Sequence, residues 1–203
     1  MEERAEGIIL RTRPLTETSL IVEWLTADAG RLATVAKGAR RPKSPFAGKL
    51  DLFYEAAFSF QRSVRSELHA LREVQVKKTH SHLRSSLPLL HQAAYFTVLL
   101  EKGTERETPL PELYALLQGY VARAPDERCL PEVMFLFEQQ YLRILGFDPQ
   151  IGHPHFDLDF ALVAPLPREE RNQLNRALRT AVGEALGQVP AQRQRAIEAM
   201  LAR

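Results

Sequence analysis

The fold is decided by residues 7–38, which read GIILRTRPLTETSLIVEWLTADAGRLATVAKG. Three runs rich in apolar and β-branched residues, at 7–13, 19–25 and 31–37, alternate with turn-forming residues. Pro14 lacks a backbone donor and ends the first run, and Ala27–Gly30 is a turn between the second and the third. The pattern predicts three short strands joined by turns.

Two further strands are predicted at 52–60 and 68–76. With a period of two, Phe58 and Phe60 share one face of the first of these, and Val74 and Val76 share one face of the second. Five short strands, with one longer connection between the third and the fourth, fit a small closed barrel such as an oligonucleotide-binding (OB) fold. We therefore expect an OB-fold domain over residues 1–80.

Beyond residue 80 the apolar residues follow helical spacing, and we expect a helical domain over 81–203. Predicted helices cover 89–102, 111–121, 131–145, 167–186 and 190 to the end, with an irregular insert at about 147–167. In the clearest case, 131–145, the apolar side chains recur at the i, i+3, i+4, i+7 spacing of one buried face. The expected fold class is α+β, a five-stranded OB-fold barrel followed by an all-α domain.

Composition excludes several classes of protein. The 203 residues are 45% hydrophobic and 26% charged, which is typical of a chain with a substantial core. No apolar run reaches the ~20 residues of a membrane-spanning helix, and the N-terminus does not resemble a secretory signal. The single cysteine, Cys129, excludes an internal disulfide. We expect a cytoplasmic protein.

Charge is concentrated in one segment, although the net charge of the chain is only +2. Between Arg31 and Lys49 there are six basic residues and no acid: Arg31, Lys37, Arg40, Arg41, Lys43 and Lys49. Such a segment either faces a polyanion, with each cation neutralising a phosphate, or is an ordinary solvated loop. Arg11 and Arg13 either extend the basic surface or discourage edge-to-edge strand pairing. Phe46 either contacts DNA bases or anchors the segment to the barrel.

Catalytic and cofactor motifs are absent from the sequence. It contains neither GxxxxGK[ST] nor GxGxxG, so nucleotide hydrolysis and dinucleotide binding are not supported. His153, His155, Asp157 and Asp159 alternate, but four same-side residues of one strand extend over more than ~15 Å and cannot all reach one ion. We therefore expect no enzyme activity, no cofactor and no bound metal, with a polar loop at this place.

Several spaced features of the first 80 residues occur in the same order in a known family. Thr12-Arg13 ends the first strand, Glu17 lies in the next turn, Thr26 ends the second strand, and Gly30 precedes the third. The basic stretch VAKGARRPKS follows at 35–44. This arrangement resembles the bacterial RecO family of recombination mediators, and the similarity continues more weakly to LGFDP at 145–149.

The resemblance implies a non-enzymatic, nucleoid-associated DNA-repair protein with an OB-fold barrel and a helical domain. Such proteins bind single- and double-stranded DNA and anneal complementary strands. They also engage the acidic C-terminal tail of the single-strand-binding protein SSB, and with RecR they help to load RecA. Many relatives carry a four-cysteine zinc module after the LGFDP-like ending, whereas QIGHPHFDLDF at 150–160 has no cysteine.

A binding site for the SSB tail requires an apolar socket and a nearby cation for the terminal carboxylate. Leu142 flanks the main apolar face of the 131–145 helix, and Arg143, Arg123 and Arg128 supply cations. The alternative is that this face is entirely core and that Arg143 only complements the helix dipole.

Two other function classes remain open. An adaptor that scaffolds SSB and RecR with little DNA binding of its own does not need the acid-free basic segment. A metal-dependent nuclease using His153 and Asp157 is the third hypothesis, and the sequence favours it least.

Overall fold

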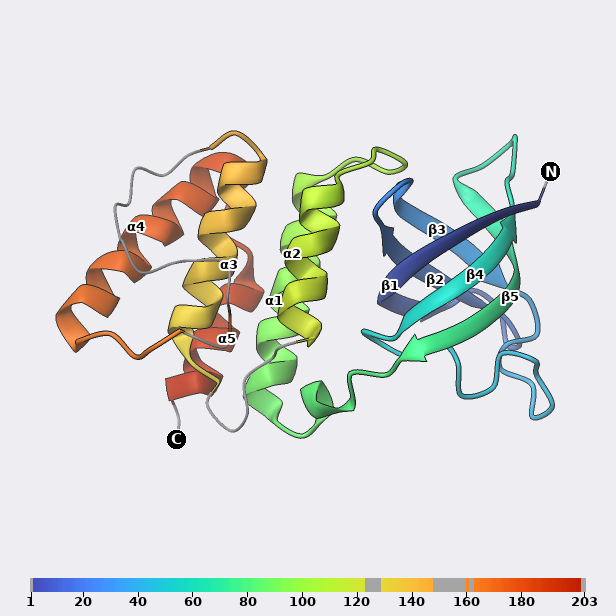
Figure 1. Cartoon of the computed structure of the whole chain (residues 1–203), viewed down its shortest axis with the longest axis horizontal. Coiled ribbons are helices and arrows are strands. Elements are labelled where there is room, and N and C mark those ends of the chain that lie inside the picture. The colour runs from blue at the N-terminus through green and yellow to red at the C-terminus, as the bar shows by residue number, and fades with distance from the viewer. Residues whose placement is uncertain (1, 123–128, 148–159, 161–162, 202–203) are drawn as a thin grey trace. The chain divides into compact units, whose positions relative to one another are not determined.

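The structure, a computed structural model, describes residues 2–122, 129–147, 160 and 163–201. Within these residues the chain forms two compact units, which we describe separately (Figure 1). The first unit comprises Met1–His80 and Thr104–Ala115, and the second comprises Ser81–Gly103 and Leu116–Arg203.

The first unit contains a closed five-stranded barrel with strand order β1-β2-β3-β5-β4, as expected for an OB fold. Only the β3–β5 pair is parallel, and the other four pairs are antiparallel. The first strand closes the barrel because its beginning pairs with β4 and its end pairs with β2. The strands are β1 (Glu2–Pro14), β2 (Leu20–Thr26), β3 (Gly30–Ala36), β4 (Glu55–Gln61) and β5 (Leu68–Lys78).

The barrel interior is organised around Trp24 and Phe58, whose stacked rings have centroids 4.1 Å apart. The indole Nε1 of the completely buried Trp24 donates a hydrogen bond of 2.8 Å to Oγ1 of Thr34, so its polar atom is satisfied inside the core. The predicted strands agree with the observed ones except at two starts. The first strand begins earlier, at Glu2, and the fourth begins only at Glu55, after a turn in which Phe53 has φ 64°.

The second unit is helical, and its elements follow the predicted segments closely. The last helical turn of α3 ends in a Schellman motif, as the predicted terminator Gly146 requires: this residue has φ 82°, and the N–H of Phe147 donates to the carbonyl of Leu142 at 2.9 Å. A short 3-10 helix, η1 (Ser81–Arg84), was not predicted. The helices are α1 (Leu87–Gly103), α2 (Pro111–Ala122), α3 (Pro131–Ile144), α4 (Arg168–Leu186) and α5 (Ala191–Leu201), and the part of α2 up to Ala115 belongs to the first unit.

The core of the helical unit is aromatic. Phe96 of α1 and Phe137 of α3 stack with ring centroids 3.7 Å apart, and the ring of Tyr120 meets both edge-on. The Tyr120 hydroxyl donates to Oε1 of Gln92 at 3.0 Å, and the Tyr95 hydroxyl donates to Oε1 of Glu138 at 2.6 Å. Both tyrosines are completely buried, and their hydroxyls are held by hydrogen bonds to neighbouring helices.

These two tyrosines make the stability of the helical unit sensitive to alkali. Burial raises the pKa of Tyr95, reinforced by the Glu138 carboxylate, and burial also raises the pKa of Tyr120. The folded chain therefore keeps two protons that the unfolded chain releases above about pH 10. We expect the free energy of unfolding to fall there by about 1.4 kcal/mol per pH unit for each tyrosine. Urea titrations across this range, with Tyr120→Phe expected to show a shallower decline, test the prediction; a constant stability would contradict it.

None of the helices among the described residues is long and apolar enough to cross a membrane.

Candidate nucleic-acid interface

The predicted basic segment lies on the connection between β3 and β4, and we call residues 37–49 the basic loop. The loop consists of successive hydrogen-bonded turns. Gly38 begins it with φ 72°, and the N–H of Arg41 donates to the Gly38 carbonyl at 3.1 Å. Equivalent i to i−3 bonds follow at Ser44, Ala47 and Lys49. The loop thus has a defined shape on which its cations are displayed.

Four cations of the basic loop are exposed to solvent: Lys37, Arg40, Arg41 and Lys43. Arg40 also fixes the start of the loop. Its backbone N–H donates to the Thr18 carbonyl at 3.0 Å, and its Nη1 donates to the Thr16 carbonyl at 3.0 Å. A guanidinium has five donors, so Arg40 can hold this turn and still meet a phosphate. Lys49, at the end of the loop, is partly buried.

Phe46 is the residue through which the basic loop is attached to the barrel. Its side chain is only 6% exposed and belongs to the same core cluster as Trp24 and Phe58. The prediction that Phe46 contacts DNA as a stacking platform is therefore corrected in favour of its alternative, the anchor. The consequence for the site is indirect: a buried ring holds Pro45 and Ala47, and with them the cations, close to the barrel surface.

Beside the basic loop lies a groove of about 790 Å³, formed by Pro45, Phe46 and Lys49 of the loop together with residues of β4 and β5 and Arg4 of β1. Its lining includes apolar side chains, three cations (Arg4, Lys49 and Arg72) and one acid, Glu73. Lys49 was predicted from the sequence as a DNA-binding residue, whereas Arg4 and Arg72 were not. Neither lies near the basic segment in sequence, and only the pairing of β1 and β5 on either side of β4 brings them to the groove.

The other predicted cations of the barrel have different surroundings. Arg11 and Arg13 are exposed on β1, and Arg13 lies 3.7 Å from the carboxylate of Glu23. Arg31 is turned toward a later part of the chain: its Nε donates to Oγ1 of Thr104 at 2.8 Å, and its Nη2 donates to the Thr104 carbonyl at 2.5 Å. The prediction that Arg31 contributes to the DNA-binding surface is corrected, because its guanidinium holds a segment of its own chain.

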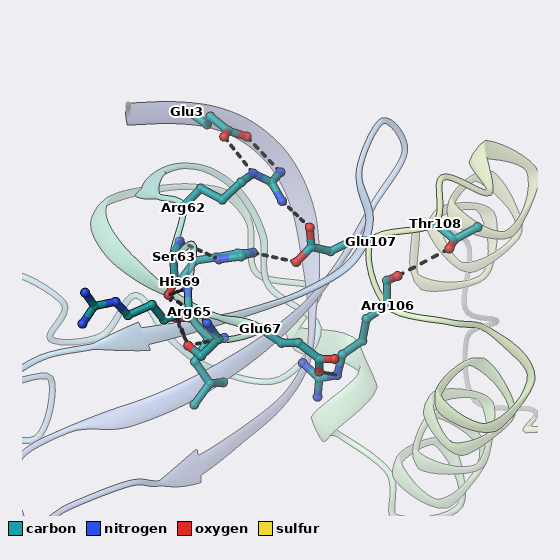
Figure 2. A network of polar contacts seen from close by, with 11 residues as sticks. Glu3, Arg62, Ser63, Arg65, Glu67, His69, Arg106, Glu107 and Thr108 are labelled. Atoms are coloured by element: carbon teal, nitrogen blue, oxygen red, sulfur yellow. Dashed lines mark hydrogen bonds and ion pairs between the residues drawn. The ribbon is translucent and has the colours of Figure 1, made fainter.

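That segment, Thr104–Leu110, which we call the strap, is bound to the barrel by backbone and side chains (Figure 2). The N–H of Glu107 donates to the Arg31 carbonyl at 3.0 Å. Arg106 meets the largely buried Glu23 of β2 at 2.9 Å and Glu67 of the β4–β5 hairpin at 3.4 Å. The predicted domain boundaries, 1–80 and 81–203, did not anticipate that residues 104–115 join the first unit.

Glu107 is the centre of the strap's attachment. Its carboxylate forms an ion pair with Arg62 and accepts a 2.9 Å hydrogen bond from Nε2 of His69, which is 2% exposed. Because Nδ1 of His69 accepts from the Ser63 N–H at 3.2 Å, the ring proton is on Nε2. The guanidinium of Arg62 in turn donates hydrogen bonds to both carboxylate oxygens of Glu3, and these hydrogen bonds lower the pKa of Glu3.

The attachment of the strap determines which face of the barrel is accessible to a ligand. OB folds commonly bind oligonucleotides across strands 2 and 3 and the loops joining strands 1–2 and 4–5. Here the strap is attached to β2 through Glu23, to β3 through Arg31, and to the β4–β5 hairpin through Arg62 and Glu67. The groove beside the basic loop lies instead over β4 and β5. The geometry therefore favours the groove and the basic loop as the nucleic-acid interface.

The two candidate SSB-tail residues that the structure describes, Leu142 and Arg143, do not form an exposed socket. Leu142 is completely buried, as are the adjacent Met134 and Phe135, so this face of α3 is core and the prediction for Leu142 is corrected. Arg143 is exposed in the last turn of α3, where a cation complements the helix dipole. Arg123 and Arg128 lie outside the described residues.

The possible metal ligands considered from the sequence belong to a part of the chain that the structure does not describe. His153, His155, Asp157 and Asp159 lie outside the described ranges. Among the residues that are described, no group of three or more His, Cys, Asp or Glu side chains is arranged to hold a metal ion. The expectation of no bound metal stays a prediction. The thiol of Cys129 is buried.

A closed five-stranded barrel with an exposed basic loop, in a chain that also has a helical unit, defines an OB-fold protein with an added α-domain. A family model described as "Recombination protein O N terminal" matches residues 1–80. Over 143 residues the chain is 34% identical to "DNA repair protein RecO" of Rhodopirellula baltica, covering 70% of this chain and 53% of that protein. The chain belongs to the RecO family.

Two further relatives bear the same name. The protein of Exiguobacterium sibiricum is 34% identical over 153 residues, or 75% of this chain and 60% of that protein. The protein of Syntrophus aciditrophicus is 28% identical over 172 residues, or 85% of this chain and 64% of that protein. The chain thus spans between about half and two thirds of the length of these curated relatives.

Proposed function

We propose that this chain is a DNA-repair protein that binds single- and double-stranded DNA through the basic loop and the adjoining groove. The observation that supports this most directly is the display of Lys37, Arg40, Arg41 and Lys43 on an ordered, acid-free loop. Cations held in this way neutralise phosphates and release condensed counterions, which supplies most of the affinity for a polyanion. An adaptor with little DNA binding has no physical need for such a loop.

The proposal extends to the activities of a RecO-type mediator. We propose that the chain anneals complementary strands, engages the SSB tail, and acts with RecR to help load RecA on SSB-coated DNA in the cytoplasm. Annealing requires two strands to be held while base pairing forms between them, and this step makes no demand for a nucleophile or a metal. We therefore propose that the chain acts without catalysis and without a cofactor.

Replacing Lys37, Arg40, Arg41 and Lys43 with alanine together tests the DNA assignment. If each cation contacts one phosphate, we expect the slope of log affinity against log salt to flatten by about 3. Fluorescence anisotropy with a labelled single strand, repeated over a range of salt concentrations, measures this slope.

Net charge alone must be separated from contact at the loop. A matched variant removes four exposed arginines of the helical unit: Arg168, Arg176, Arg179 and Arg195. This control is expected to change the slope much less than the loop variant. A folded loop variant with unchanged affinity and slope would remove the basic loop from the DNA site.

A further inference from the structure

The turn between β1 and β2, residues 15–19, is closed by its own hydrogen bonds. The N–H of Leu15 donates to the Ser19 carbonyl at 3.0 Å. The hydroxyl oxygen of Thr16 accepts two more bonds, from the N–H groups of Thr18 at 3.3 Å and Ser19 at 3.1 Å. A side-chain hydroxyl that bonds to backbone N–H groups a few residues later stabilises a turn. The Thr16 hydroxyl therefore helps to fix the directions of the carbonyls in this turn.

Two of these carbonyls hold Arg40, which lies 24 residues after Thr16 in the chain. The Thr18 carbonyl accepts from the backbone N–H of Arg40, and the Thr16 carbonyl accepts from its guanidinium Nη1, both at 3.0 Å. The acid of the turn, Glu17, is exposed and forms no ion pair with a described residue. A neutral carbonyl orients a guanidinium without cancelling its charge. Arg40 is thus held in place and keeps both its charge and further donors for an anion.

We propose that Thr16 is a positioning residue of the DNA interface, which acts on DNA through Arg40 and not by a contact of its own. This inference rests on the proposed function and adds an uncharged residue from a second loop. Phe46 anchors the later part of the basic loop in the barrel core, whereas the turn holds its beginning at Arg40. A side chain that is ordered before binding loses less entropy on binding, so the turn raises the affinity above what the charges alone supply.

Thr16→Val tests the inference, because it replaces the hydroxyl with a methyl group of similar size and changes no charge. Using the full chain and a labelled single strand, we expect binding to be about three- to tenfold weaker. The slope of log affinity against log salt should not change, since no cation is lost. Thr16→Ser keeps the hydroxyl and should bind like the unmodified protein. The matched control is Thr18→Val, whose hydroxyl bonds to no described residue, and its affinity should not change.

A double-mutant cycle separates an effect through Arg40 from a general loosening of the barrel. In an Arg40→Ala background, Thr16→Val should weaken binding by less than about twofold, because the turn no longer has a guanidinium to hold. In an Arg41→Ala background the full loss should remain, since the Arg41 guanidinium bonds to no described residue. Each arginine variant alone should reduce the salt slope for a single strand by about 0.7, as expected for one lost phosphate contact.

A full loss of affinity on adding Thr16→Val to Arg40→Ala would overturn the inference, as would an unchanged affinity or a changed salt slope in Thr16→Val alone. If Thr16→Val does not fold, the two arginine variants decide. At equal slopes Arg40→Ala should bind at least about threefold more weakly than Arg41→Ala, because it also loses the bond to the turn, and equal affinities would contradict this. Failure of the proposed function has a different signature, because the unmodified protein would then bind no strand at all.

Discussion

Arg193→Ala is expected to lower the free energy of unfolding by about 3–5 kcal/mol, because it leaves the Glu138 carboxylate buried without its partner. Arg193 is 2% exposed and Glu138 is completely buried. The guanidinium donates from Nε and Nη2 to the two carboxylate oxygens at 2.7 and 3.0 Å, and from Nη1 to Oδ1 of Asn175 at 2.8 Å. One side chain of α5 therefore holds α3 and α4 together.

Both charges of this pair are buried, so each needs the opposite charge of the other to offset the cost of leaving water. Burial lowers the pKa of Arg193, but the Glu138 carboxylate and the Tyr95 hydroxyl together raise it by more, so the net shift is upward and the guanidinium stays charged. Urea unfolding followed by circular dichroism measures the loss. Arg195→Ala, an exposed arginine two residues later on the same helix, is the control and should change stability by less than about 0.5 kcal/mol. Similar losses of unfolding free energy in the two variants would contradict the predicted contribution of the buried ion pair.

Gly30→Ala is expected to destabilise the barrel unit by about 2–5 kcal/mol, through two costs that add. Gly30 has φ +65°, which an L-residue with a Cβ adopts at a cost of about 1–2 kcal/mol. A Cβ at this position would also lie 2.1 Å from the carbonyl oxygen of Thr108 in the strap. Because the obstacle is backbone, the strap has to shift, and overpacking of this kind typically costs about 1–3 kcal/mol.

Gly48 separates the two costs. Its φ is +71°, but a Cβ there would have no heavy atom within 4 Å, so Gly48→Ala carries only the conformational cost. Urea unfolding of both variants should therefore give a clearly larger loss for Gly30→Ala. Equal losses would mean that the strap does not approach the β2–β3 turn as closely as described.

The barrel could be predicted because its sequence signals are local. Alternation of side chains, Pro14 after the first strand and Gly30 before the third all act within a few residues, and the five strands were found in order. The same holds for the end of α3, where Gly146 supplies a positive φ that the last turn needs. Boundaries failed where a signal was weak, as at Leu52–Tyr54, whose apolar residues belong to a turn before β4.

The strap could not be predicted, because its contacts join residues far apart in the chain. Arg31 and Thr104 are 73 residues apart, and a lone arginine in a basic segment gives no sign that it faces inward. Phe46 posed the same problem: its ring could face either a ligand or the core, and only the packing around Trp24 decided it. Arg4 and Arg72 were missed because β-sheet pairing, not sequence proximity, places them at the groove.

The strap has a consequence for the order in which the newly made chain matures. Domains tend to fold as they leave the ribosome, at roughly 5–20 residues per second. When residue 80 has emerged, all five strands are present, but His69 and the largely buried Glu23 still lack Glu107 and Arg106. Their partners are synthesised only after the whole of α1. The nascent barrel therefore passes through a stage with its β2–β3 face uncovered, and it closes that face only once part of the helical unit has been made.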